Sequence, residues 1–151
     1  MEYEYTKGKQ FVIFKLANQY YGIDIQAVQI IERVKSIMRI PKAPSCVKGV
    51  MNLRGEIIPV VDMRLKFGLE EQAYDEDTRI IIVKMDEDMV GIIVDQVKEV
   101  IELAGSQIET VQNIQDKTNA NHIQGVGKLD AEDLIVTLLN LNNIIEEAFQ
   151  I

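Results

Sequence analysis

The sequence has no tryptophan, one cysteine and one histidine among its 151 residues. A single cysteine cannot form an intramolecular disulfide, which fits a reducing compartment. Basic residues are scarce too, because 16 Lys and Arg stand against 24 Asp and Glu, for a net charge of −8. Binding to nucleic acid needs a basic surface that releases counterions from the phosphates, so this composition excludes nucleic acid as a partner.

Long hydrophobic runs are also absent. The apolar run at 80–83 has four residues, far fewer than the roughly 20 that a membrane-spanning helix needs. The first residues, 1–5, have neither the basic region nor the apolar region of a signal peptide. We therefore expect a cytoplasmic protein with no direct membrane insertion.

What the sequence does contain is isoleucine and valine, with 22 Ile and 15 Val. Their β-branched side chains pack well on a pleated sheet, so this surplus favours β structure. Short apolar runs bounded by turn residues predict strands at 11–16, 20–25, 37–40, 50–53, 57–61, 79–85, 90–94, 123–126 and 134–139. The spacing of apolar residues at 141–149 predicts a helix, and the polar stretch 72–77 predicts an exposed linker. Many short strands are typical of small barrels or a sandwich.

The chain repeats itself at a shift of 69 residues. Residues 11–16 superpose on 80–85, and the pair Gly22-Ile23 superposes on Gly91-Ile92. A second echo, at a shift of 76 residues, places 47–50 on 123–126. Chance similarity among apolar strands is the alternative, but the constant offset favours two homologous lobes. We expect a single domain with lobe one at about 10–78 and lobe two at about 79–145. Whether the termini cross between the lobes is left open.

The lone Cys46 and the lone His122 are the first candidates for catalysis. The residues around Cys46 do not resemble the surroundings of a nucleophile, and the sequence predicts a compact apolar residue at a turn. His122 is predicted to be a loop residue before a strand. No ligand spacing supports a metal site, and no glycine-rich loop supports a phosphate site. We therefore expect no enzyme activity, no cofactor and no metal.

The segment 40–69 carries all three prolines, Pro41, Pro44 and Pro59. Pro59 lies in an apolar run, which predicts an edge strand or a bulge, because proline has no N–H to donate to a strand ladder. The residues at 52–55 predict a hairpin tip that presents Arg54 to solvent. On an acidic protein, that guanidinium is either an ordinary solvated charge or an anchor for a carboxylate of a partner.

In their order and spacing, these motifs resemble the CheW family of bacterial chemotaxis coupling proteins. The matching stretches are 21–25, 40–44, 47–55, 58–64, 67–68, 91–95 and 123–126. The resemblance implies an all-β fold of two intertwined five-stranded Src-homology-3-like β-barrel subdomains, with short helices and a C-terminal helix. Two departures are that Met63 stands where leucine is commoner, and Ile30 where the family often has an acidic residue.

The resemblance also implies a non-catalytic adaptor that couples methyl-accepting chemotaxis receptors to the histidine kinase CheA. The partners would be the cytoplasmic tip of the receptor and the regulatory domain of the kinase, in arrays associated with the membrane. The implied receptor-binding residues are Val28, Ile30, Ile31, Val47, Gly49, Asn52 and Arg54. For Val28 and Ile31 a plain core role is equally open, because the repeat matches them with apolar residues, Val97 and Val100. No residue of the kinase contact is implied.

Two alternatives remain. One is a CheW-like regulatory module of another kinase pathway, although a chain that begins with Met and ends soon after the motifs favours a free-standing protein. The other is a small-molecule-binding β-barrel, which would need a pocket with convergent polar groups.

Overall fold

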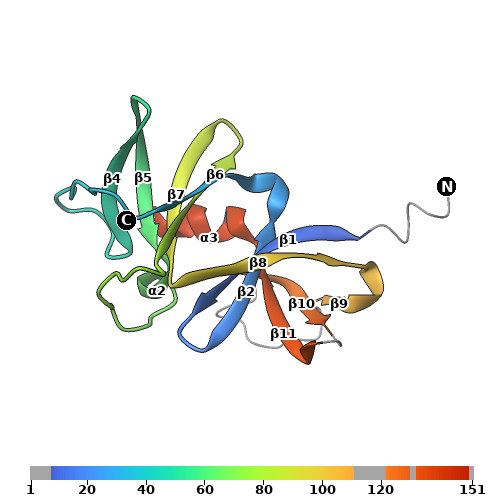
Figure 1. Ribbon diagram of the computed structural model, residues 1–151. Coiled ribbons are helices and arrows are strands. Elements are labelled where there is room, and N and C mark those ends of the chain that lie inside the picture. The colour runs from blue at the N-terminus through green and yellow to red at the C-terminus, as the bar shows by residue number, and fades with distance from the viewer. Residues whose placement is uncertain (1–7, 111–121, 130–131, 150–151) are drawn as a thin grey trace.

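The computed structural model describes residues 8–110, 122–129 and 132–149, which fold mostly into strands (Figure 1). The strands are β1 (Lys9–Leu16), β2 (Gln19–Asp24), β3 (Val28–Arg33), β4 (Val47–Leu53), β5 (Glu56–Asp62), β6 (Arg79–Met85), β7 (Asp88–Val94), β8 (Gln96–Leu103), β9 (Ile108–Thr110), β10 (Ile123–Leu129) and β11 (Leu134–Leu139). The helices are the 3-10 turns η1 (Ile25–Ala27) and η2 (Gly105–Gln107) and the α-helices α2 (Met63–Lys66) and α3 (Leu141–Ala148).

The strands form two sheets of related order. Sheet A has the order β8-β1-β2-β11-β10-β9, and sheet B has the order β3-β6-β7-β5-β4. The sequence repeat relates β1, β2 and β3 to β6, β7 and β8, and it relates β4 to β10. With β5 matched to β11, the order of sheet B reproduces the first five strands of sheet A. The predicted all-β fold of two intertwined barrels is confirmed, and β9 adds a sixth strand to sheet A.

The intertwining arises from an exchange of hairpins between the two repeats. The β1–β2 hairpin lies in sheet A with β8 to β11, whereas the β6–β7 hairpin lies in sheet B with β3 to β5. Each exchanged hairpin pairs with its host sheet on both sides. The pairing is antiparallel on one side, β1 with β8 and β6 with β3, and parallel on the other, β2 with β11 and β7 with β5. The expected division of the chain between residues 78 and 79 therefore does not coincide with the division into sheets.

A hydrophobic core between the two sheets holds them together. Successive side chains of a strand point to opposite faces, so β1 places Phe11 and Ile13 in a core within sheet A. Its Val12 and Phe14 enter the inter-sheet core, which also contains side chains of sheet B and of α3. Because β1 is buried on both faces, it appears in the sequence as a continuous apolar run.

Both α-helices begin at a side-chain cap. The carboxylate of Asp62 accepts hydrogen bonds from the backbone N–H groups of Arg64 and Leu65, at 2.9 and 3.4 Å, where α2 begins. At α3, Asn140 accepts one from Asn143 at 3.2 Å. These caps satisfy N–H groups that have no partner within the helix. The helix predicted at 141–149 is confirmed, and its apolar face lies in the inter-sheet core.

The strand predicted at 37–40 is wrong. Only an isolated bridge forms there, in which Met38 and Val50 exchange two N–H···O bonds of 2.8 Å each. Pro41, three residues beyond Met38, has no N–H to continue a ladder.

An edge strand or a bulge was predicted at Pro59. β5 is not an edge strand, because it lies between β7 and β4, and the bulge of this pair lies in β4, between Val47 and Gly49. The reason for the prediction, that proline has no N–H to donate to a neighbouring strand, still applies at this position. The pairing of β5 with β7 begins only at Val60, so Pro59 has a strand neighbour on the β4 side alone. The missing N–H of proline therefore costs no hydrogen bond to β7 at this position.

Candidate functional site

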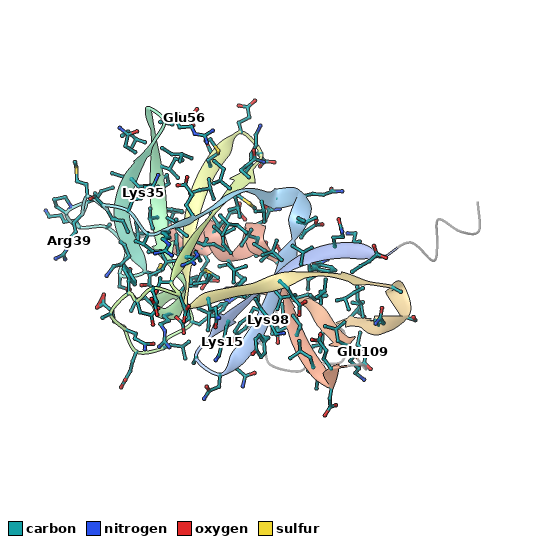
Figure 2. The ribbon with its side chains drawn as sticks, in the orientation of Figure 1. Lys15, Lys35, Arg39, Glu56, Lys98 and Glu109 are labelled. Carbon is teal, nitrogen blue, oxygen red and sulfur yellow. The ribbon has the colours of Figure 1, made fainter. Side chains whose placement is uncertain are left out.

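The tip of the β4–β5 hairpin carries Arg54 as predicted. The Asn52 side chain accepts a hydrogen bond of 2.8 Å from the backbone N–H of Gly55, which closes the turn. Arg54 has a φ of 52° and is exposed, and it makes no hydrogen bond or ion pair with the described residues. Glu56, two residues after Arg54, lies at the same end of the hairpin (Figure 2). The guanidinium is therefore available to a partner.

Two other predicted site residues on β4 have clear roles in the fold. Gly49 has a φ of 145°, and a Cβ atom there would lie 1.9 Å from the carbonyl oxygen of Met38. Only glycine permits this close approach of the two backbone segments. Val47 is 9% exposed and belongs to the inter-sheet core. A contact of Val47 or Gly49 with a partner stays a prediction.

The remaining predicted residues lie on β3, at the opposite edge of sheet B from β4. Val28 packs against the inter-sheet core and Ile30 against the core of sheet B, so both are partly buried. Ile31 points outward and is 39% exposed. The predicted site is therefore divided between two edges, and Ile31 and Arg54 offer it exposed side chains.

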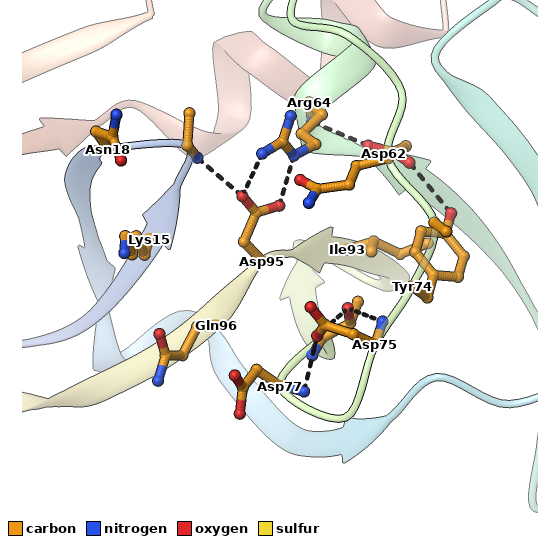
Figure 3. Close-up of a pocket in the computed structure, with 14 residues that line it drawn as sticks. Lys15, Asn18, Asp62, Arg64, Tyr74, Asp75, Asp77, Ile93, Asp95 and Gln96 are labelled. Carbon is orange, nitrogen blue, oxygen red and sulfur yellow. Dashed lines mark hydrogen bonds and ion pairs between the residues drawn. The ribbon is translucent and has the colours of Figure 1, made fainter.

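A polar cluster that the sequence did not predict joins the two sheets (Figure 3). Arg64, in α2, donates from Nε and Nη2 to the two carboxylate oxygens of Asp95, at 2.7 and 2.8 Å. Asp95 lies between β7 of sheet B and β8 of sheet A, and it also accepts the N–H of Ala17 from the β1–β2 turn at 2.8 Å. The hydrogen bond to Asp95 raises the pKa of Arg64. This carboxylate therefore links elements of both sheets.

The linker at 72–77 borders the same cluster, beside a cavity of about 420 Å³. Tyr74 donates its hydroxyl hydrogen bond to Asp62 at 3.1 Å. Burial, and then the charge of Asp62, raise the pKa of Tyr74 well above its ordinary value. Asp62 thus caps α2 with one oxygen and holds the linker with the other. Because its main charged groups already bind each other, the cluster acts as a structural brace.

The two residues considered for catalysis do not form a catalytic pair. Cys46 is 7% exposed, and its Sγ donates to the carbonyl of Ala148 at 3.6 Å. Burial raises the pKa of the Cys46 thiol, which disfavours the reactive thiolate. His122 precedes β10 as predicted, but it is buried, with 6% exposure. Its Nε2 lies 2.6 Å from a carboxylate oxygen of Glu147 in α3.

Glu147 connects three elements through this contact. Its other carboxylate oxygen accepts a hydrogen bond of 2.8 Å from Lys66, at the end of α2. The hydrogen bonds from Lys66 and then His122 lower the pKa of Glu147. The three side chains therefore tie α2, α3 and the start of β10 together, which is a structural role.

Within residues 8–110, 122–129 and 132–149, no three His, Cys, Asp or Glu side chains are grouped to hold a metal ion. In the same described part of the chain, no helix is long and apolar enough to cross a bilayer.

The fold places the chain in a class of all-β proteins built from two intertwined Src-homology-3-like barrels. The family model of the CheW-like domain matches residues 10–149. The chain belongs to this family.

Relatives named chemotaxis protein CheW match along most of the chain. The protein of Klebsiella aerogenes is 39% identical over 131 residues, which is 87% of this chain and 79% of the relative. That of Helicobacter pylori is 34% identical over 143 residues, 93% of this chain and 83% of the relative. A solved structure, the scaffolding protein TtCheW from Thermoanaerobacter tengcongensis, superposes with a TM-score of 0.83 at 35% identity, covering 92% of this chain and 93% of that one.

Proposed function

We propose that this chain is a non-catalytic chemotaxis adaptor that couples methyl-accepting receptors to the histidine kinase CheA. The observation that carries the proposal is the match of the CheW-like family model to residues 10–149, together with relatives named for chemotaxis and a structural neighbour named as a scaffold. The adaptor would bind the cytoplasmic tip of the receptor and the regulatory domain of the kinase. It would thereby be recruited to receptor arrays at the membrane.

The chemistry of the described residues supports an adaptor without catalysis. The buried Cys46 has a raised thiol pKa, and the ring of His122 is engaged with Glu147. Signalling by such a protein would consist of a shift in population between assemblies in which the kinase is on or off.

Receptor contact is proposed for the hairpin tip and for the outer face of β3. Arg54 offers an exposed guanidinium that can bind a carboxylate in two-pronged geometry, and Ile31 offers exposed apolar area. Val28, Ile30, Val47, Gly49 and Asn52 would support these contacts through the sheet and the turn. The residues that contact the kinase stay unassigned.

The test is binding of the purified chain to two separate probes, a receptor tip fragment and the CheA regulatory domain. We expect it to bind each, with interfaces of about 800 Å² per partner or less. A chain that binds neither contradicts the proposal. Binding to a regulatory domain from another kinase system, without binding to these probes, would instead favour the regulatory module of a different pathway.

A further inference from the structure

A small pocket of about 280 Å³ lies where sheet A meets the end of α2. Tyr21 of β2 pairs with Thr137 of β11. Leu139, two residues further along β11, pairs with Ile123 of β10. Residues paired across strands point to the same face of a sheet, as do residues i and i+2 of one strand. These four side chains therefore form the floor of the pocket.

Aromatic rings stand in a row along the pocket. The ring of Phe67, directly after α2, lies 5.4 Å from the ring of Tyr21 and 6.4 Å from the ring of His122, measured between centroids. Aromatic rings attract one another at centroid separations of about 4.5–7 Å. Leu69 adds an aliphatic side chain to the same wall. A flat aromatic molecule in the pocket would therefore contact rings and aliphatic side chains together.

A buried ring nitrogen of His122 has no hydrogen-bond partner, although His122 lines this pocket. The side chain is 7% exposed, and its Nε2 lies 2.6 Å from a carboxylate oxygen of Glu147. Because the pKa of Glu147 is lowered, its carboxylate is ionised at neutral pH and only accepts hydrogen bonds, so Nε2 carries the hydrogen. In the neutral ring, Nδ1 is then an acceptor without a donor. A buried acceptor in this state is costly, and a ligand that donates to it removes the cost.

The other polar groups of the pocket fit a neutral ligand. The hydroxyls of Tyr21 and Thr137 line the pocket and hydrogen-bond to no other residue in the described part of the chain. Each can donate to a ligand or accept from it. Lys66 also lines the pocket, but Glu147 already neutralises its charge at 2.8 Å. Among the described lining residues there is no Asp or Glu.

We propose that this pocket binds a small neutral aromatic molecule with an N–H or O–H donor, such as an indole or a phenol. Its ring would pack on Phe67, and its donor would bind Nδ1 of His122. A cavity of about 150 Å³ can hold benzene, so this pocket admits a molecule of one or two rings. A ligand of that size binds with a dissociation constant on the order of 1 mM. The site goes beyond the proposed adaptor function and does not depend on it, because it involves this chain alone.

Titration of the ¹⁵N-labelled full chain with indole, followed by NMR, tests this proposal. We expect saturable shifts of the amide signals at 66–69, 122–123 and 137–139, around the pocket. The Nδ1 signal of His122 should shift as well, because it gains a hydrogen bond. Benzofuran has the shape of indole but an oxygen in place of the N–H group, so it should bind about tenfold more weakly. His122→Phe keeps a ring but removes the acceptor, and it should bind the two probes equally.

A second variant fills the pocket. Thr137→Phe places a large ring on its floor and should weaken indole binding at least about tenfold. Thr110→Phe is the matched control, the same substitution at an exposed strand residue outside the pocket, and should bind indole like the wild type. Unfolding curves check that every variant is folded.

The proposal is supported if indole shifts the pocket signals, benzofuran binds more weakly and Thr137→Phe alone of the two threonine variants loses binding. It is overturned if indole gives no saturable shifts at the pocket, or if benzofuran binds the wild type as tightly as indole does. It is equally overturned if His122→Phe still prefers indole, or if Thr137→Phe and Thr110→Phe bind indole alike.

Discussion

Arg64 and Asp95 form a two-pronged ion pair, Nε to Oδ1 at 2.7 Å and Nη2 to Oδ2 at 2.8 Å, at the junction of the two sheets. The same carboxylate accepts the N–H of Ala17, whose φ of 56° belongs to the tight β1–β2 turn. Both charged side chains are largely shielded from water, with 15% exposure for Arg64 and 25% for Asp95. The pair therefore links the β1–β2 hairpin, which lies in sheet A, to α2, which follows β5 of sheet B.

Asp95→Ala should lower the free energy of unfolding by about 2–3 kcal/mol, because it leaves a shielded guanidinium and a turn N–H without their acceptor. Urea denaturation measures this loss. Asp77→Ala, at an exposed carboxylate in the linker, is the control and should change stability by less than about 0.5 kcal/mol. In the Arg64→Ala and Asp95→Ala double variant, the loss should be smaller than the sum of the single losses. Additive losses would show that the pair contributes nothing as a pair.

Gly49→Ala should destabilise the fold by about 3 kcal/mol or more, because its Cβ would collide with backbone rather than with a movable side chain. The collision is with the carbonyl oxygen of Met38, so the bridge from Met38 to Val50 should open. Gly55→Ala is the matched comparison: its φ is 88°, but no atom lies within 4 Å of the added Cβ. That variant should lose only about 1 kcal/mol. Equal losses, measured by denaturation, would contradict this explanation of Gly49.

Glu147→Gln should lower stability at neutral pH, but not at acid pH. The hydrogen bonds from Lys66 and His122 lower the pKa of Glu147 in the folded state. A lowered folded pKa adds stability above the unfolded pKa, about 4.3 for Glu, and that stability is lost as the pH falls through the folded pKa. The effect is small, since the Glu147 side chain is 52% exposed. A difference between variant and wild type that persisted in acid would contradict it.

Arg54→Glu should leave the unfolding free energy within about 0.5 kcal/mol of the wild type, because Arg54 is exposed and makes no ion pair with the described residues. We expect weaker binding to a receptor tip fragment, with binding to the kinase regulatory domain unchanged. Lys84→Glu, which reverses an exposed charge on β6, is the control. If Arg54→Glu binds the receptor fragment as well as the wild type does, Arg54 is not an anchor.

Strands with a continuous apolar run were predictable from the sequence, whereas the edge strands β3, β8 and β9 were not; the edge strand β4 was predicted only in part, at 50–53. β6 has the predicted bounds because its apolar run is continuous, as burial on both faces requires. The edge strands β3 and β8 were missed. Exposed and more buried residues alternate along both strands, and both carry charged residues such as Glu32 and Lys98. No continuous apolar run therefore marks them in the sequence. The three-residue strand β9 is too short to give a pattern.

The exchange of hairpins could not be predicted from local patterns. The two hairpins are related by the repeat, so each offers similar side chains to either sheet. Asp95 and Arg64 are 31 positions apart, and only the fold brings them together. A groove lined by Ile57, Met89 and Phe149 is likewise assembled from three separate segments, around β5, the β6–β7 turn and α3.

Co-sedimentation with receptor-containing vesicles tests the adaptor role most directly. Purified CheA kinase is mixed with vesicles that carry a methyl-accepting receptor, with and without this chain, and the kinase in the pellet is measured. We predict that the chain raises the sedimented kinase severalfold and appears in the pellet itself, because one molecule holds both partners at once. If the chain sediments with the vesicles and the amount of kinase in the pellet is unchanged, this chain does not couple receptor to kinase.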